Sequence, residues 1–114
     1  MKINSRIYVA GHRGLAGSAI YRALKKAGYQ NIITRSHSEL ELLEASEVRA
    51  FFSETKPEFV FLAAAKVGGI HANSSYPADF IRENIVVQTN VIHEAWKHDV
   101  NKLVFLGSSC IYPK

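Results

Sequence analysis

Residues 6–20 read Arg6-Ile-Tyr-Val-Ala-Gly11-His-Arg-Gly14-Leu-Ala-Gly17-Ser-Ala-Ile20. A short apolar run ends at Gly11, glycines follow at intervals of three, and a helical pattern then begins. A strand that turns directly into a helix brings unpaired backbone N–H groups and the positive end of the helix dipole to one point. Glycines there let a pyrophosphate approach the backbone, so the stretch predicts an anion-binding turn between a strand and a helix. The alternative is a glycine-rich turn that only closes a strand–helix corner.

The composition is typical of a globular protein. The chain has 114 residues, of which 47% are hydrophobic and 21% charged, and its length fits one ordinary domain. The net charge of +4 comes from basic residues scattered along the chain. A nucleic-acid-binding face would need a clustered basic patch, so we expect no nucleic-acid partner. A mildly basic chain suits a small anionic ligand.

Cysteine usage and hydropathy indicate the compartment. Cys110 is the single cysteine, which predicts no internal disulfide and favours a reducing compartment. The first residues lack the apolar core of a signal peptide. The apolar run 59–65 is far too short to span a membrane. We therefore expect a cytoplasmic protein without a membrane partner, and the sequence suggests no metal site.

Strand and helix patterns alternate along the chain. Apolar runs of strand length lie at residues 6–10, 31–34, 59–63 and 102–106, and helical spacing lies at about 15–27, 45–55 and 77–98. This alternation predicts an α/β fold of the Rossmann type, with a parallel sheet and helices on both faces. Ligands bind such sheets beyond the carboxyl ends of the strands, where this chain places its unusual segments.

The helix expected at 77–98 has an unusually wide apolar surface. Its apolar positions are 80, 81, 85, 87, 91, 92, 95 and 96, which is more than one packing partner needs. We expect it to pack on the sheet with one side and, in a homodimer, on a helix of a second subunit with the other. A helix buried deeply within its own domain is the alternative.

Two arginines lie at positions that would distinguish NADP from NAD. Arg35 follows the second strand, where NAD-binding proteins carry an acid for the ribose hydroxyls, and Arg13 lies within the glycine turn. Guanidinium groups favour a 2′-phosphate through charge-assisted contacts. The sequence therefore favours NADP over NAD, and two solvated surface arginines are the alternative.

Several motifs together resemble one known family. The chain carries the glycine turn, Ala63-Ala-Ala-Lys-Val-Gly-Gly-Ile70, Tyr76-Pro-Ala-Asp-Phe80, Asn84 with Asn90, and Gly107-Ser-Ser-Cys-Ile-Tyr-Pro-Lys114. With these motifs it resembles the GDP-L-fucose synthase family, the 3,5-epimerase-4-reductases of the extended short-chain dehydrogenase/reductase group. The wide glycine spacing is shared across that superfamily, whereas the Lys-Val-Gly-Gly and Ser-Ser-Cys-Ile-Tyr-Pro segments resemble this branch only.

The resemblance implies specific roles. NADP(H) would be bound by Gly11, His12, Arg13, Gly14, Leu15, Ala16, Gly17, Arg35, Ala63, Ala64, Ala65 and Lys66. The substrate would be GDP-4-dehydro-6-deoxy-D-mannose, which the family converts to GDP-L-fucose by epimerisation at C3 and C5 and reduction at C4. Ser108 matches the catalytic serine that bonds the 4-keto oxygen, and Cys110 matches the cysteine that acts as acid or base in epimerisation.

The chain departs from the family in one respect. The family's Tyr-x-x-x-Lys pair is matched only by Tyr21 and Lys25, which fall on the helix beneath the glycine turn and so in the wrong place. We expect the true pair, and the substrate domain, beyond Lys114, so that residues 1–114 would be the N-terminal part of an NADP-binding Rossmann domain, truncated after the fourth strand and inactive alone. Two alternatives stay open: a non-catalytic dinucleotide-binding module, and another nucleotide-sugar epimerase or dehydratase of the same group.

Overall fold

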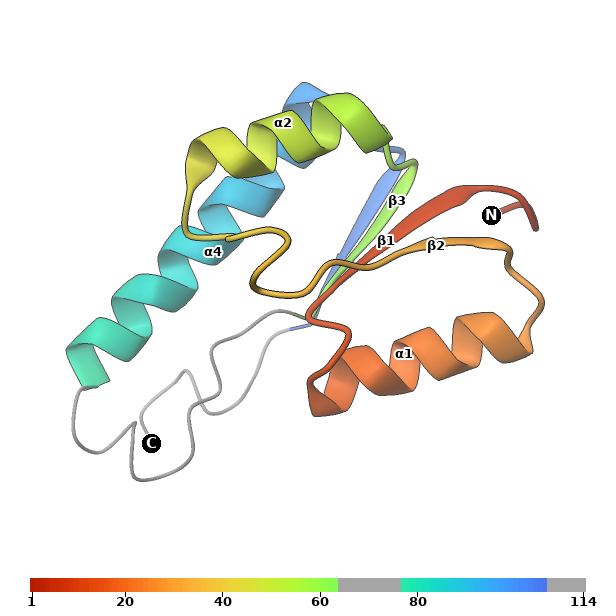
Figure 1. Cartoon of the computed structure of the whole chain (residues 1–114), viewed down its shortest axis with the longest axis horizontal. Coiled ribbons are helices and arrows are strands. Elements are labelled where there is room, and N and C mark those ends of the chain that lie inside the picture. Colours follow the sequence, from red (N-terminus) through yellow and green to blue (C-terminus); the bar gives the residue numbers. More distant parts are fainter. Residues whose placement is uncertain (64–76, 107–114) are drawn as a thin grey trace.

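The structure, a computed structural model, describes residues 1–63 and 77–106 (Figure 1). Its elements, in chain order, are β1 (Arg6–Ala10), α1 (Leu15–Lys26), β2 (Asn31–Ile33), α2 (Ala45–Thr55), β3 (Phe59–Leu62), α4 (Pro77–Lys97) and β4 (Lys102–Phe105). Three strands end one residue before the predicted position. The next N–H group still continues the ladder in two cases, because Ala63 donates to Ala10 O at 3.0 Å and Leu106 to Leu62 O at 3.1 Å.

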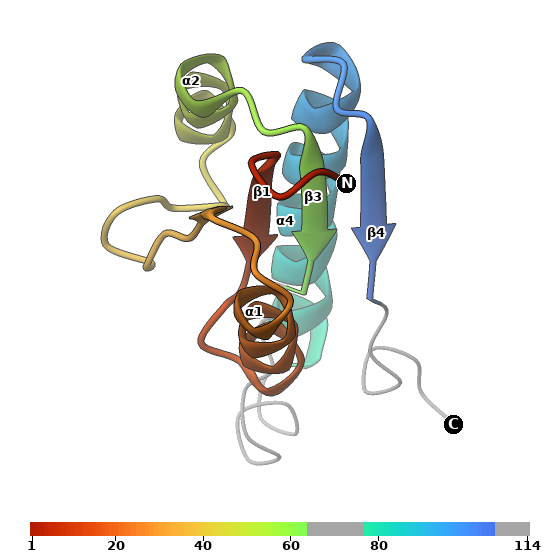
Figure 2. The ribbon, with the colours of Figure 1, turned by 90° about the vertical axis from the view of Figure 1, so that its right-hand side faces the viewer.

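The four strands form one parallel sheet in the order β2-β1-β3-β4. Tyr8 of β1 is opposite Ile33 of β2 and Val60 of β3, so β1 lies inside the sheet. Figure 2 shows β1, β3 and β4 running in the same direction. The predicted Rossmann-type α/β fold is therefore confirmed.

Helices cover both faces of this sheet. Figure 1 shows α1 on one face and α2 with α4 on the other. Alternate residues of β1 explain the division: Ile7 and Val9 pack toward Leu24 of α1, whereas Tyr8 and Ala10 join the cluster of α2 and α4. Burial of each large side chain in this core stabilises the fold by roughly 1.5–3 kcal/mol.

Helix α1 ends in a Schellman motif at Gly28. Gly28 has φ +95°, its N–H donates to Lys25 O at 3.1 Å, and Tyr29 N–H donates to Leu24 O at 3.2 Å. The same pattern ends α4, where Asp99 has φ +55° and Val100 N–H donates to Ala95 O at 3.0 Å. There a residue with a Cβ occupies the left-handed position.

Helix α4 has two apolar faces with different surroundings. One face is buried and carries Val87, Val91 and Ala95. The other is exposed and carries Ile81, Ile85, Ile92 and Trp96, and the Trp96 side chain is 76% exposed. The expectation that one side packs on the sheet is confirmed. Among residues 1–63 and 77–106, the other side stays exposed in part, and most of all at Trp96.

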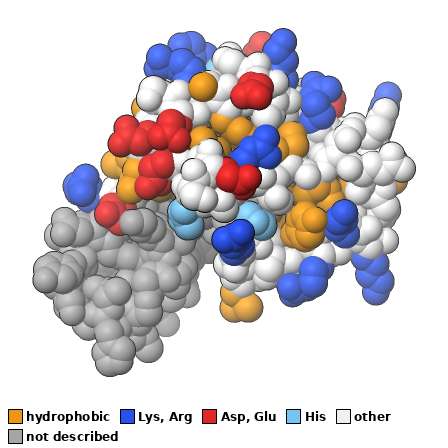
Figure 3. Space-filling model, viewed as in Figure 1, with side chains coloured by type: hydrophobic (Ala, Val, Ile, Leu, Met, Phe, Trp, Pro, Cys, Tyr) orange, Lys and Arg blue, Asp and Glu red, His pale blue; other side chains and the backbone are white. Residues whose placement is uncertain are grey.

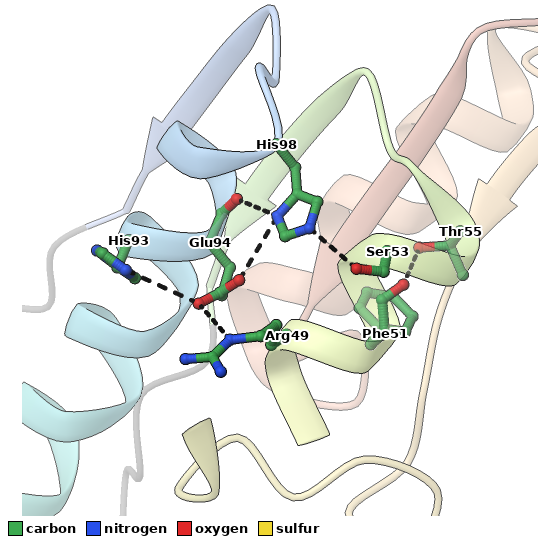
Figure 4. A network of polar contacts seen from close by, with 7 residues as sticks. All are labelled: Arg49, Phe51, Ser53, Thr55, His93, Glu94 and His98. Atoms are coloured by element: carbon green, nitrogen blue, oxygen red, sulfur yellow. Dashed lines mark hydrogen bonds and ion pairs between the residues drawn. The ribbon is translucent and has the colours of Figure 1, made fainter. Parts of the chain in front are cut away.

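A buried carboxylate joins α4 to α2 (Figure 4). Glu94 is 2% exposed, and its Oε2 lies 3.7 Å from Arg49 Nε. His98 Nδ1 donates to the Glu94 carbonyl oxygen at 2.9 Å and lies 3.5 Å from Glu94 Oε1. His98 Nε2 lies 3.1 Å from Ser53 Oγ. Polar contacts therefore cross the α2–α4 interface beside the aromatic core.

The surface carries charges of both signs. Figure 3 shows Lys and Arg side chains spread over one face, with acidic side chains between them. Among the described residues, no helix is both long and apolar enough to cross a membrane.

Candidate functional site

The glycine turn joins β1 to α1 by a close approach of backbone to backbone. Gly11 has φ +83°, which favours glycine, and its carbonyl oxygen accepts a hydrogen bond from Gly14 N–H at 3.0 Å. A Cβ on Gly17 would overlap the Gly11 carbonyl group, whereas a Cβ on Gly14 would make only an ordinary contact. Gly11 and Gly17 are therefore required by the turn itself.

The turn leaves the N-terminus of α1 open. Gly14 is the N-cap and makes no side-chain capping bond, and the first turn contains no acidic residue. The N–H groups of Leu15, Ala16 and Gly17 have no partner within a helix at these positions. Leu15 is 91% exposed. The positive end of the helix dipole is thus available to an anion.

The turn lies at the point where the strand order reverses. From β1 the chain continues to β2 on one side, and β3 then pairs with β1 on the other. Gly11 follows β1 and Ala63 follows β3. The hydrogen bond from Ala63 to Ala10 joins the ends of these two neighbouring strands. Ligands of open parallel α/β sheets bind at such a switch point.

Arg35 follows β2 at the same end of the sheet. Its Nη1 donates to Thr34 O at 2.8 Å, and its guanidinium carbon lies 5.3 Å from the centroid of the Phe51 ring. The group is half-buried.

Arg13 and Arg35 act on a common carboxylate. Hydrogen bonds from the backbone and side chain of Ser36 lower the pKa of Glu39 below its ordinary value, and the charges of Arg35 and Arg13 lower it further. Glu39 Oε1 accepts the Ser36 N–H bond at 2.8 Å. The positive charge of both arginines therefore favours the ionised form of Glu39 on this exposed loop.

Sequence reasoning missed two contacts that hold the loop after β2. Asn90 Nδ2 of α4 donates to Leu42 O at 2.8 Å, and Phe51 of α2 lies against Arg35. Asn90 is present among the family motifs, but nothing in its spacing indicates Leu42 as its partner. Helical spacing puts Phe51 on the same side of α2 as Val48 and Phe52, and all three are buried, but the spacing does not indicate the contact of Phe51 with Arg35.

Some of the predicted site residues lie outside the part of the chain that the structure describes, whereas the Tyr-x-x-x-Lys match lies inside it. Ala64, Ala65, Lys66, Ser108 and Cys110 lie outside the described residues. Tyr21 and Lys25 lie on α1, where Lys25 Nζ is 5.8 Å from the centroid of the Tyr21 ring. Both residues therefore lie on the helix that follows the glycine turn, where the sequence places them. In the described part of the chain, no three His, Cys, Asp or Glu residues gather as metal ligands would.

Curated relatives are similar over nearly the whole chain. GDP-L-fucose synthase 1 of Arabidopsis thaliana is 60% identical over 111 residues, which are 97% of this chain and 34% of the relative. GDP-L-fucose synthase of Escherichia coli strain K12 is 54% identical over 109 residues, which are 96% of this chain and 34% of the relative. The chain therefore spans about a third of the length of these relatives.

A solved structure and a family model agree with the fold. The GDP-mannoheptose C4 reductase MlghC of Campylobacter jejuni, solved with NADP bound, is 47% identical with a TM-score of 0.91, covering 99% of this chain and 36% of that one. The model described as the NAD dependent epimerase/dehydratase family matches residues 7–114. With its parallel sheet and glycine turn, the chain belongs to the NAD dependent epimerase/dehydratase family.

Proposed function

We propose that this chain supplies the NADP(H)-binding part of an enzyme that converts GDP-4-dehydro-6-deoxy-D-mannose to GDP-L-fucose. The observation that carries the proposal is the open N-terminus of α1 at the carboxyl end of the parallel strands, with Arg35 following β2 at the same end of the sheet. The identity of 54–62% to proteins named GDP-L-fucose synthase, including a putative one, supports the same assignment. We propose that residues 1–114 form the N-terminal part of the NADP-binding domain.

The cofactor would be held by residues with separate tasks. The N–H groups of Leu15, Ala16 and Gly17 would bind the pyrophosphate, because the dipole and the free donors favour an anion there. Arg13 and Arg35 would contact the 2′-phosphate. His12 and Leu15 lie on the glycine turn and would lie beside the cofactor. Residues 63–66, including Ala63, Ala64, Ala65 and Lys66, would line the cofactor from the end of β3. NADPH, when bound, supplies the hydride that reduces C4 of the sugar.

Two residues would act on the sugar. Ser108 would donate a hydrogen bond to the 4-keto oxygen, which stabilises the charge that develops on it during enolisation and reduction. Cys110 would move a proton at C3 or C5 as acid or base. Replacement of Cys110 by Ser should stop exchange of the C3 and C5 hydrogens with solvent while NADPH binding persists. Undiminished exchange would remove Cys110 from the mechanism.

We also propose a homodimer formed through α4. The exposed face of Ile81, Ile85, Ile92 and Trp96 is contiguous along the helix and borders an open groove with Gln88, Thr89 and His93. Exposed apolar stripes of this kind mark interaction surfaces. A second copy of α4 would match this face in length and character.

A reducing, cytoplasmic location is supported by Cys110 as the single cysteine.

A chimera tests the activity. Residues 1–114 would replace the corresponding third of the Escherichia coli relative, and NADPH oxidation with GDP-4-keto-6-deoxymannose would be followed together with product identity. Formation of GDP-L-fucose at a rate near that of the relative is the expected result. A chimera that binds NADPH without turnover would favour a non-catalytic dinucleotide-binding module. Oxidised NAD retained through purification would favour a different nucleotide-sugar epimerase or dehydratase.

A further inference from the structure

The guanidinium group of Arg35 is held by two contacts with different geometry. Nη1 donates in the plane of the group to Thr34 O at 2.8 Å. The guanidinium carbon lies 5.3 Å from the centroid of the Phe51 ring, within the range of a cation–π contact. The ring therefore supports the group without using any of its N–H donors, so the remaining donors stay available to a ligand.

The Phe51 ring is itself fixed. It is 6% exposed, and its centroid lies 4.5 Å from that of Tyr8 and 5.7 Å from that of Phe52. The Phe51 and Phe52 rings meet at an interplanar angle of 83°, an edge-to-face arrangement that stabilises aromatic pairs. Tyr8 and Phe52 are both fully buried. An arginine that lies on this ring thus has a rigid support from β1 and α2.

We infer that Phe51 is a positioning residue that sets the preference for a 2′-phosphorylated nucleotide by holding Arg35 against its ring. The inference rests on the proposed function, in which Arg35 contacts the 2′-phosphate. A free arginine loses rotamer entropy when it binds a ligand, and a supported one loses less. Because Phe51 acts through Arg35, its effect is confined to ligands that carry the 2′-phosphate.

The test compares two small ligands that differ only in that group. Binding of 2′,5′-ADP and of 5′-AMP would be measured by calorimetry in the chain itself and in the chimera. Phe51→Leu should weaken 2′,5′-ADP about two- to fivefold, the effect of one cation–π contact, and leave 5′-AMP unchanged. Phe51→Tyr, which keeps the aromatic ring, should retain the preference for 2′,5′-ADP over 5′-AMP.

Phe52→Leu is the matched structural control. Phe52 belongs to the same aromatic cluster and the same helix, and it is fully buried. Its replacement should lower stability at least as much as Phe51→Leu, with the ratio of the two affinities unchanged. Equal weakening of both ligands by Phe51→Leu, or a changed ratio in Phe52→Leu, would overturn the positioning role.

Arg35→Ala separates this inference from the proposed function. If Arg35→Ala leaves the ratio unchanged, the phosphate contact itself is wrong. If Arg35→Ala lowers the ratio and Phe51→Leu does not, only the role of Phe51 is wrong. Should Phe51→Leu fail to fold, NMR of the unsubstituted protein gives the answer, since the ring current of Phe51 must shift the Arg35 side-chain signals upfield. Unshifted signals would overturn the inference.

Discussion

The carbonyl oxygen of Gly11 occupies the position where a side chain at Gly17 would begin. The turn can therefore close only around a residue without a Cβ. Gly14, the middle glycine, has space for a Cβ, whose nearest neighbour, the Gly11 carbonyl oxygen, would lie 3.5 Å away.

This difference predicts unequal effects of the same substitution. Gly17→Ala should lower the free energy of unfolding by about 1–3 kcal/mol, because the backbone of the turn must move to admit the methyl group. Gly14→Ala should cost less than about 1 kcal/mol. Chemical denaturation of the two variants measures both values, and equal losses would contradict the geometry.

Replacement of Arg35 tests the cofactor assignment. Arg35→Ala should raise the Kd for NADPH tenfold or more, since one hydrogen bond to a charged group contributes about 1.5–3 kcal/mol. The Kd for NADH should change little, because NADH lacks the 2′-phosphate. Titration of the chimera with both cofactors gives the two values. Parallel weakening of NADPH and NADH would contradict a phosphate contact.

The exposed face of α4 predicts the behaviour of the proposed dimer. Ile92→Glu or Trp96→Glu should raise the dimer dissociation constant of the chimera more than tenfold, because each places a charge in an apolar interface. Lys97→Glu, an exposed substitution on the same helix outside that face, is the control. Analytical ultracentrifugation distinguishes the two species. A dimer that all three variants leave intact must use another surface.

The left-handed helix ends predict one stabilising and one destabilising change. Asp99→Gly should raise the free energy of unfolding by roughly 0.5–1 kcal/mol, because φ of +55° is unfavourable for a residue with a Cβ. Gly28→Ala should lower it by a similar amount, since a Cβ there has space but the φ of +95° is strained. Thermal unfolding of both variants measures the pair of effects, whose signs must be opposite.

Tyr8 predicts how stability depends on alkaline pH. Burial raises the pKa of Tyr8 far above its ordinary value of 10.0, and the smaller effect of the Arg35 charge opposes this shift. Above pH 10 the unfolded chain loses this proton and the folded chain keeps it, so the free energy of unfolding falls by up to about 1.4 kcal/mol per pH unit. Tyr8→Phe should lack this component. Chemical denaturation at a series of pH values measures this difference. If the free energies of unfolding of the two proteins fall equally above pH 10, the prediction is wrong.

Much of the fold follows from the sequence because local patterns and tertiary structure agree. The continuous apolar run of β1 fits a strand covered on both faces, and Gly28 marks a helix end through its own conformational freedom. The end of α4 is harder to predict, because Asp99 adopts the left-handed conformation without being glycine. The next residue, Val100, packs against the core, and local sequence does not indicate this contact.

The site is only partly predictable for a different reason. The turn Gly11–Gly17 and Arg35 are marked by residue type and spacing, so the sequence indicates them. The support of Arg35 by Phe51, the bond from Asn90 to Leu42, and the buried Glu94 depend on segments that meet only in the folded chain. Helical periodicity places Glu94 beside Ala95 and Val91, but it gives no reason for a carboxylate on that side of α4.

The bond between Asn90 and Leu42 also affects the order in which the molecule can be built on a ribosome. The strands β1 and β2 with α1 are complete once residue 33 has emerged. The loop that follows them can form its bond to α4 only after Asn90 has been synthesised, 48 residues after Leu42. Translation therefore delivers the glycine turn early and the anchor of the Arg35 loop late. Under the proposed function, a nascent chain would have its pyrophosphate-binding turn well before it could discriminate between nucleotides.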